Sequence, residues 1–250
     1  MTQVKKVTAM KKSNRKGRFI LLVGSDHKKL SYLSVLLKRF EYQTYMVKTA
    51  GEVIELVASA MPSLIIMFLD LKDIDSLKLM QGLKKKPDIA GIPFFTLIEE
   101  GDAAAEKRCF LYGATECFSL SISPDQLFQL VQRAVEETPR SHIRIRMLLP
   151  VRLTSSLGET YRTCMLDLSE RGMFLACENP SAVNTRISLL INLNGRLIPV
   201  EALVHAASSN DEGPYLQAGM GLEFVKIKAE DQDAIHQFIL DDIMRGIDPV

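Results

Sequence analysis

Two short segments of the chain carry side chains suited to binding a phosphorylated ligand. The first contains Arg140 and Arg144, separated by three residues, and the second reads D-L-S-E-R-G over residues 167–172. Arginine guanidinium groups match phosphate oxygens and the O6/N7 edge of guanine. The carboxylate of the second segment can accept from N–H donors such as those on the opposite edge of guanine. The residue types therefore indicate a phosphorylated guanine nucleotide rather than a catalytic reaction.

Neither segment is specific by itself. Arginines at a domain junction often pair with Asp or Glu of the neighbouring domain, and D-x-S-x-x-G also occurs as an Asx-type turn. Together the two segments favour ligand binding. The candidate contacts are Arg140, Arg144, Asp167, Ser169 and Gly172. Arg146 and Arg171 lie beside them and are second-rank candidates, or merely solvated arginines.

Composition and charge are those of an ordinary globular protein. The chain has 250 residues, of which 47% are hydrophobic and 24% charged. Its apolar runs are too short to span a bilayer and no signal peptide is visible, so we expect a cytoplasmic protein without an integral membrane segment. The net charge is +1, but residues 1–18 carry seven positive and no negative side chains, which leaves −6 elsewhere.

This charge distribution argues against broad nucleic-acid binding, because most of the chain is acidic. The basic segment could touch RNA or anionic lipid. The simpler interpretation, which we prefer, is that residues 1–17 form a disordered, solvated tail.

Cysteine and histidine show no metal-ligand spacing, and no C-x-x-C pair occurs. The cysteines lie in apolar segments, which predicts reduced thiols in the core. A metal site is not expected, and His142 is interpreted as a linker residue. The cysteines are Cys109, Cys117, Cys164 and Cys177.

Residues 18–137 alternate short apolar runs with amphipathic segments. Five strands alternating with five helices predict a doubly wound α/β domain of the flavodoxin-like kind. The predicted strands are Phe19–Val23, Tyr42–Val47, Leu64–Phe68, Ile92–Ile98 and Glu116–Leu120. The predicted helices are Lys28–Phe40, Gly51–Ala60, Leu77–Lys84, Ala103–Tyr112 and a last one that begins at Ser123-Pro124-Asp125 and ends at Val135.

Residues 138–250 change to short strands followed by one helix. This pattern predicts a small antiparallel β-barrel with a C-terminal helix over Ala229–Met244, and Asn194-Gly195 is expected to form a hairpin turn. The strands are expected at Met147–Thr154, Thr160–Leu166, Met173–Cys177, Arg186–Leu193, Leu197–Ala207 and Gly219–Val225.

Residues 18–137 resemble the receiver domain of bacterial response regulators. The resemblance rests on the order of elements and on the sequences at residues 62–67, 92–93 and 113–114. Receivers transfer a phosphoryl group to an aspartate that ends the third strand, with an acidic pair for magnesium, a Ser/Thr and a Lys. The aspartate position here holds Phe68, a degenerate phosphoacceptor position.

The other receiver positions are also substituted. Gly24-Ser25 replaces the acidic pair, Ile98 the hydroxyl and Leu120 the lysine. The resemblance therefore implies an inert pseudo-receiver that serves in interaction, or as a rigid spacer. Asp70 would be an alternative acceptor if the strand slipped by two residues, although the lost lysine counts against it.

Residues 138–250 resemble a PilZ domain, the bacterial receptor module for cyclic di-GMP. The family signature is R-x-x-x-R followed by D/N-x-S-x-x-G, and residues 219–224 resemble its G-x-G-x-x-F strand. The resemblance implies that Arg140 and Arg144 meet phosphate and guanine from a flexible loop before the barrel. It implies that Asp167 and Ser169 bind guanine and ribose. Gly172 would allow close backbone approach and a positive φ.

Taken together, the resemblances imply a bacterial second-messenger effector and not an enzyme. It would bind cyclic di-GMP, as one molecule or an intercalated pair, and relay it by interdomain or partner rearrangement. Partners would include a signalling or motility protein, with a homodimer left open, and outputs would be motility or biofilm control. The alternative is a PilZ-type adaptor that binds no nucleotide. Phe68 and Leu120 disfavour a phosphorylation-driven regulator, and a cofactor-using enzyme would need a glycine-rich loop after Val23.

Overall fold

A computed structural model describes residues 18–154, 160–208 and 218–247. These residues divide into two compact units. Residues 18–141 with 244–247 form the α/β unit, and residues 142–243 form the barrel unit. The tail expected over residues 1–17 lies outside the described residues.

The α/β unit is built on a five-stranded parallel sheet with strand order β2-β1-β3-β4-β5. This is the flavodoxin-like order, so the predicted doubly wound fold is confirmed. Strands β1, β3 and β4 are buried at every position, which explains why they appear in the sequence as unbroken apolar runs. The strands are β1 (Phe19–Val23), β2 (Gln43–Val47), β3 (Leu64–Phe68), β4 (Phe94–Leu97) and β5 (Glu116–Phe118).

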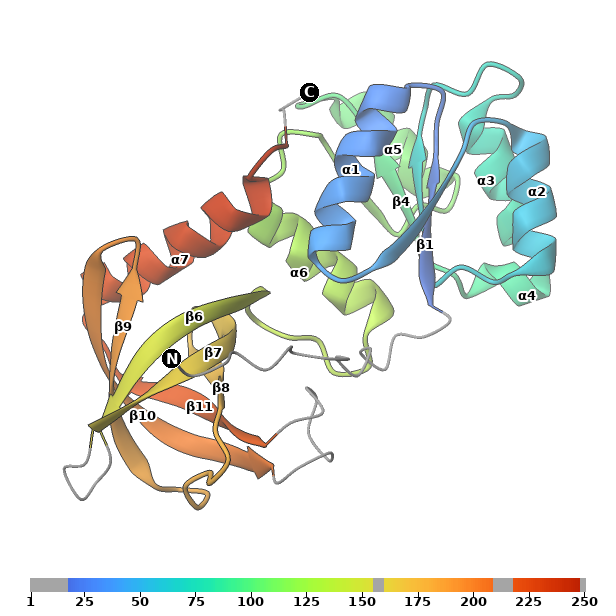
Figure 1. The fold of residues 1–250 in the computed structure, drawn as a ribbon. Coiled ribbons are helices and arrows are strands. Elements are labelled where there is room, and N and C mark those ends of the chain that lie inside the picture. The colour runs from blue at the N-terminus through green and yellow to red at the C-terminus, as the bar shows by residue number, and fades with distance from the viewer. Residues whose placement is uncertain (1–17, 155–159, 209–217, 248–250) are drawn as a thin grey trace. The chain divides into compact units, whose positions relative to one another are not determined.

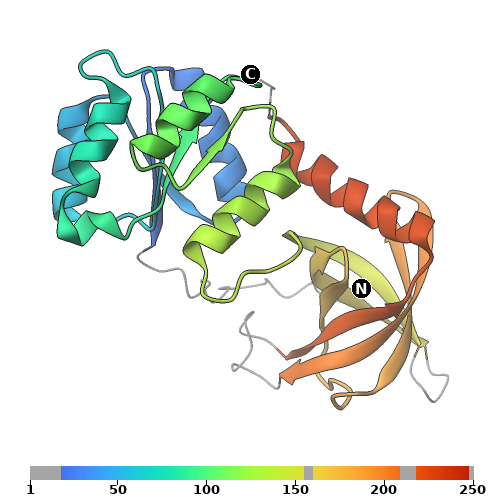
Figure 2. The ribbon, with the colours of Figure 1, turned by 180° about the vertical axis from the view of Figure 1, so that it is seen from behind.

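Helices cover both faces of this sheet (Figures 1 and 2). Helices α1 (His27–Arg39) and α6 (Pro124–Val135) lie on one face, and α2 (Ala50–Ser59) and α3 (Ser76–Lys84) on the other. Their ends follow local capping rules: Ser123 caps α6 in a capping box with Gln126. The remaining helices are α4 (Pro87–Ala90), which the sequence did not predict because four residues show no periodicity, and α5 (Ala103–Leu111).

The barrel unit is a closed antiparallel barrel of order β10-β11-β8-β7-β6-β9, followed by helix α7 (Ala229–Met244) (Figure 1). The predicted barrel with a C-terminal helix is therefore confirmed. Asn194 and Gly195 have φ of 52° and 93°, as the expected hairpin turn requires. The strands are β6 (Arg144–Thr154), β7 (Thr160–Ser169), β8 (Gly172–Ala176), β9 (Arg186–Leu193), β10 (Arg196–Ser208) and β11 (Gly219–Lys226).

Alternating residues of the barrel strands point inward and form its core. On β9, for example, Ile187, Leu189 and Ile191 are buried while their neighbours are not. The same alternation places Cys164 on the outer side of β7, where it is exposed. The expectation that all four cysteines are core thiols was therefore wrong for Cys164.

Candidate functional site

Strand β6 begins at Arg144, so the second arginine of R-x-x-x-R lies in the barrel wall. The prediction that both arginines precede the first strand was wrong for Arg144. The reason is alternation: Ile143 and Ile145 are only 4% and 5% exposed, whereas Arg144 and Arg146 are exposed. Burying both isoleucines requires extended backbone at Arg144, which therefore starts the strand.

Arg144 and Arg146 lie opposite the polar residues of D-x-S-x-x-G across the β6–β7 ladder. Arg144 pairs with Ser169, and Arg146 pairs with Asp167. Directly opposed residues of antiparallel strands point to the same face, and the residue pair between these two is buried in the barrel core. The structure thus brings Arg144, Arg146, Asp167 and Ser169 together on the outer face of the barrel.

The D-x-S-x-x-G segment forms a tight hairpin between β7 and β8. Ser169 and Gly172 are the last paired residues, which leaves Glu170 and Arg171 at the tip, where Arg171 is exposed. The Ser169 hydroxyl donates to the carbonyl oxygen of Gly172 at 3.0 Å. Because that hydrogen is already engaged, the Ser169 oxygen can take part in further hydrogen bonds only as an acceptor. Asp167 and Ser169 are 5% and 7% exposed, so the rest of the protein covers most of both residues.

Gly172 is needed for the packing of the chain against itself. A Cβ at this position would lie 2.2 Å from the carbonyl oxygen of Leu222, on the neighbouring strand β11. Its φ does not fall in the positive range, so the expectation of a positive φ at Gly172 was wrong. The expected close backbone approach is present, and the approaching backbone is that of β11.

Two residues outside the predicted site connect its two segments. His142 Nδ1 lies 2.8 Å from Glu170 Oε2, so the chain just before β6 contacts the tip of the β7–β8 hairpin. Sequence reasoning had treated His142 as a linker residue. Its place between Arg140 and Arg144 was the available signal, since it lies inside the R-x-x-x-R segment.

Arg140 belongs to the α/β unit, where helix α6 fixes its backbone. Its N–H donates to Gln132 Oε1 at 2.9 Å, and the carbonyl of Ser141 accepts from Gln129 Nε2. Gln132 is fully buried, and its amide donates to the hydroxyl of Tyr42 at 2.7 Å. Two hydrogen bonds, from the Arg140 N–H to Gln132 and from Gln132 to Tyr42, therefore connect the backbone of Arg140 to the core of the α/β unit.

The end of β3, where the resemblance to receivers predicts a phosphoacceptor position, holds a buried aromatic ring. Phe68 ends β3 and is 5% exposed. A Cβ at Gly24 would lie 2.9 Å from Phe68 Cδ2 and 3.0 Å from Phe68 Cβ. Glycine at position 24 therefore makes room for the phenylalanine at position 68.

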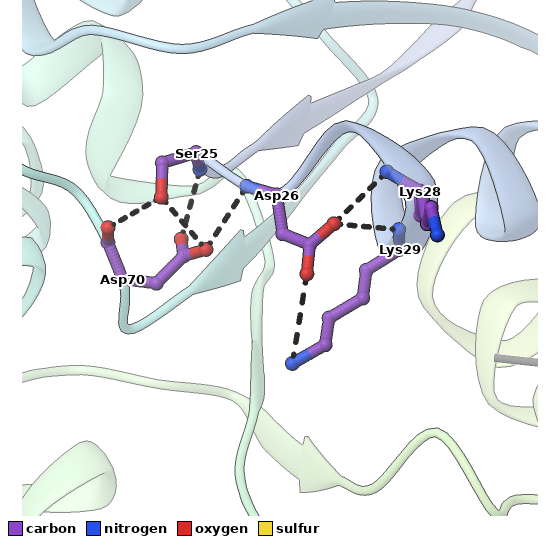
Figure 3. A network of polar contacts seen from close by, with 5 residues as sticks. All are labelled: Ser25, Asp26, Lys28, Lys29 and Asp70. Atoms are coloured by element: carbon purple, nitrogen blue, oxygen red, sulfur yellow. Dashed lines mark hydrogen bonds and ion pairs between the residues drawn. The ribbon is translucent and has the colours of Figure 1, made fainter.

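Asp70 is occupied in binding the loop after β1 (Figure 3). Its Oδ1 accepts from the N–H of Ser25 at 2.9 Å, and its Oδ2 accepts from the Ser25 hydroxyl at 3.0 Å and the Asp26 N–H at 3.1 Å. Asp26 in turn caps α1 by accepting from the N–H groups of Lys28 and Lys29 (Figure 3). The single hydrogen of the Ser25 hydroxyl is shared between Oδ2 and the carbonyl oxygen of Asp70, which lies nearer, at 2.8 Å. With two backbone N–H donors on its carboxylate, Asp70 acts as a structural cap.

Ile98, directly after β4, lies beside acidic side chains. Ile98 and Leu120 follow β4 and β5 and have no hydroxyl or ammonium group. Ile98 lines a shallow hollow together with Glu99, Glu100, Asp102 and Glu106. Carboxylates here repel a phosphoryl group rather than stabilise it.

Metal-binding groups and membrane-spanning helices are both absent from the part of the chain that the structure describes. Within residues 18–154, 160–208 and 218–247, no group of three or more His, Cys, Asp or Glu side chains is placed to hold a metal ion. No helix in these ranges has the length and apolar character to cross a membrane.

Comparison with known proteins identifies the second part of the chain. Residues 138–241 match the PilZ domain family. No curated protein matches the chain. The barrel, the arginine segment and the D-x-S-x-x-G hairpin described above all fall within the matched range.

Solved structures with similar folds include receiver domains. The receiver domain of a signal transduction histidine kinase from Syntrophus aciditrophicus is 25% identical, over 49% of this chain and 93% of that chain, with a TM-score of 0.45. The receiver domain of NtrX from Brucella abortus is 19% identical, over 48% and 99%, with a TM-score of 0.44. The Bacillus subtilis inhibitor of motility (MotI/DgrA) is 24% identical, over 44% and 53%, with a TM-score of 0.39.

The strand order of the α/β unit and the family match of the barrel lead to one description of the chain. The order β2-β1-β3-β4-β5 is shared with receivers. The chain contains a PilZ domain, residues 138–241, preceded by an α/β domain of the receiver fold.

Proposed function

We propose that this protein is a cyclic di-GMP effector that binds the nucleotide through its PilZ domain and relays it by rearrangement of its domains or of a partner. A PilZ domain implies an effector role connected with cyclic di-GMP. The observation that carries the proposal is the β6–β7 register, which sets Arg144 opposite Ser169 and Arg146 opposite Asp167 on one outer face. Two guanidinium groups beside a carboxylate and a hydroxyl oxygen suit a ligand that has phosphates and guanine together.

Each residue has a distinct role in this proposal. Arg144 contacts phosphate and the O6/N7 edge of guanine, and Arg146 supports it from the same face. Asp167 accepts from the N–H donors on the opposite edge of guanine. Ser169 accepts from a ribose hydroxyl, since its own hydrogen is donated to Gly172. Gly172 keeps the hairpin against β11.

Arg140 gives the ligand a way to act on the α/β unit. Its backbone is bonded to the buried Gln132 of α6, so a ligand that pulls Arg140 toward the barrel acts on this hydrogen bond. A ligand that prefers one arrangement of the two units shifts the population toward it. The α/β unit is proposed to be a non-phosphorylatable interaction domain, and the whole protein a cytoplasmic regulator without enzymatic activity.

Titration of the full chain with cyclic di-GMP by isothermal calorimetry tests this proposal. Saturable binding is expected, and cyclic di-AMP is the matched control because it keeps the phosphates and loses the guanine edges. An absence of heat at concentrations on the order of tens of micromolar would contradict nucleotide binding. That result would favour the alternative of a PilZ-type adaptor that recognises only protein.

A further inference from the structure

We propose that Glu170 is a positioning residue that fixes the arm, defined as residues 142–146, over the β7–β8 hairpin and joins both to α7. The proposal deepens the proposed function, since the arm carries Arg144 and Arg146. Glu170 occupies a variable position of D-x-S-x-x-G, at the hairpin tip between Ser169 and Gly172. Its carboxylate reaches two other segments of the barrel unit, the arm and α7.

The shortest of these contacts is with the arm. His142 Nδ1 and Glu170 Oε2 lie 2.8 Å apart, and the side chains are 29% and 26% exposed. A carboxylate has no hydrogen to donate, so the imidazole is the donor. Partial burial shields this contact from solvent and favours a charge-assisted hydrogen bond.

The other contacts join Glu170 to α7. Gln232 Nε2 donates to Glu170 Oε1 at 3.3 Å. His236 Nδ1 lies 3.6 Å from Glu170 Oε2, a distance at which it attracts the carboxylate when the imidazole is protonated. Gln232 and His236 are four residues apart and therefore share one face of the helix. One carboxylate thus links the arm, the hairpin and α7.

The arm connects the Glu170 contact to the candidate ligand site, because His142 and Arg144 lie close together in it. His142 lies two residues before Arg144, the first residue of β6, so its contact with Glu170 holds the chain that leads into the strand. Arg144 is paired with Ser169, the neighbour of Glu170. Fixing His142 therefore fixes the direction from which Arg144 approaches the ligand, and a side chain already in place loses less entropy on binding.

Positioning and simple electrostatics predict opposite effects of removing Glu170. A carboxylate beside two ligand phosphates repels them, so its charge alone would make Glu170→Ala bind cyclic di-GMP more tightly. Positioning predicts weaker binding by Glu170→Ala. Glu170→Gln loses the charge but keeps an oxygen that accepts from His142, so it is expected to bind at least as tightly as the wild type.

Calorimetric titrations with cyclic di-GMP provide the first test. Glu170→Ala and His142→Ala are each expected to weaken binding roughly three- to tenfold, the effect of losing one hydrogen bond of this kind. The double variant is expected to be no weaker than either single variant, because both remove the same contact. Tighter binding by Glu170→Ala, or multiplied effects in the double variant, would overturn the proposal.

Glu201→Ala is the matched control. Glu201 Oε1 lies 2.7 Å from Lys226 Nζ, in an ion pair between β10 and β11 of the same barrel. This variant also removes one barrel carboxylate and breaks an ion pair, without touching the arm or the contacts of Glu170. Unchanged affinity is expected, and a loss equal to that of Glu170→Ala would show that the effect is not specific to the arm and would overturn the proposal.

Hydrogen exchange of the ligand-free protein separates this proposal from the proposed function. Amides of residues 142–146 are expected to exchange faster in Glu170→Ala and His142→Ala, and at the wild-type rate in Glu170→Gln and Glu201→Ala. Unchanged exchange in both alanine variants would overturn the positioning role, and His142→Ala decides it if Glu170→Ala does not fold. If exchange responds as expected while the wild type binds no cyclic di-GMP, the ligand is wrong and the positioning role stands.

Discussion

The ring of Phe68 fills the space that any side chain at position 24 would need. A Cβ built at Gly24 comes within 2.9 Å of Phe68 Cδ2, closer than carbon atoms pack. Phe68 ends β3 and Gly24 follows β1, so the pair lies where adjacent parallel strands end. Packing thus joins the end of β3 to the residue that follows β1.

The first prediction concerns this pair. Gly24→Ala is expected to destabilise the protein by about 1–3 kcal/mol, because the added methyl group overpacks against the ring. In a Phe68→Ala background the same substitution should destabilise the protein less, since the ring contact at 2.9 Å is gone while the contacts with the residue 68 Cβ at 3.0 Å and Asp70 Oδ1 at 3.1 Å remain. Urea unfolding of the four proteins measures the coupling. Equal destabilisation in both backgrounds would contradict the packing argument.

Gly51 is the matched control for this measurement. It is the second residue of α2, and a Cβ there meets nothing within 4 Å. Gly51→Ala is therefore expected to stabilise the protein, by up to about 1 kcal/mol, since alanine has the higher helix propensity. Destabilisation by Gly51→Ala would show that the free energy of unfolding does not depend on how closely other atoms surround the substituted glycine.

The second prediction is that acetyl phosphate does not label the protein. The reasons are that Phe68 has no nucleophilic oxygen and that the Asp70 carboxylate already accepts from two backbone N–H groups. Phe68→Asp should also stay unlabelled, because Gly24-Ser25 and Leu120 supply neither metal ligands nor a lysine. Intact-mass measurement after incubation with magnesium is the test, with a working receiver as positive control. A stoichiometric, acid-labile adduct on the wild type would refute the prediction.

Much of the fold follows from local patterns in the sequence. Buried strands such as Leu64–Phe68 and the hairpin at Asn194-Gly195 were predicted because apolar runs and turn residues act over a few neighbours. The helix α4 was missed because one turn, Pro87–Ala90, has no period to detect. The start of β6 was placed three residues late, since the alternation at Ile143 and Ile145 was overlooked.

The candidate site was predictable as a set of residue types but not as an arrangement. The sequence identifies Asp167 and Ser169, yet their pairing with Arg146 and Arg144 depends on the register between two strands. The contact between His142 and Glu170 joins residues 28 apart in sequence, and no local pattern announces it. Such contacts depend on how distant segments of the chain pack in the folded protein, so only the structure shows them.

The third prediction separates two glycines of the barrel. Gly172→Ala is expected to destabilise the barrel by more than about 2 kcal/mol, because its Cβ would lie 2.2 Å from the Leu222 carbonyl oxygen, a backbone atom. At Gly221 the nearest atom to a Cβ is the Cβ of Ala206 at 3.6 Å, an ordinary contact, so Gly221→Ala should be tolerated. Thermal unfolding compares the two variants. Similar midpoints would contradict the close-approach explanation.

The fourth prediction concerns cysteine reactivity. Burial raises the pKa of Cys117 to about 11, and its sulfur lies 3.0 Å from the Thr96 hydroxyl oxygen. A raised pKa leaves only about one thiolate in a thousand at pH 8, and the thiolate is the reactive form. Cys164 is exposed. Iodoacetamide at pH 8 should therefore modify Cys164 well before Cys117.

Peptide mass spectrometry over a time course measures both rates. Raising the pH should speed modification of Cys117 by roughly tenfold per unit until the pKa is reached, because the thiolate fraction grows in that proportion. Unfolding in urea provides the control, in which both cysteines should react alike. Equal rates in the folded protein at pH 8 would contradict the effect of burial.

The fifth prediction compares two arginines of β6. Arg144 pairs with Ser169 at the candidate site, whereas Arg152 pairs with Arg162 farther along the same two strands. Arg144→Ala is expected to weaken cyclic di-GMP binding by about 2–4 kcal/mol, the loss seen when one partner of a charged contact is truncated. Arg152→Ala should change it by less than about 0.5 kcal/mol, as an exposed residue outside the site. Two like charges that face each other across strands are mildly destabilising, so Arg152→Ala should also leave the barrel at least as stable as before. Calorimetric titration of both variants with cyclic di-GMP is the test. Equal losses of affinity would contradict the prediction, because they would mean that binding depends on the overall positive charge and not on the outer face that Arg144 shares with Ser169.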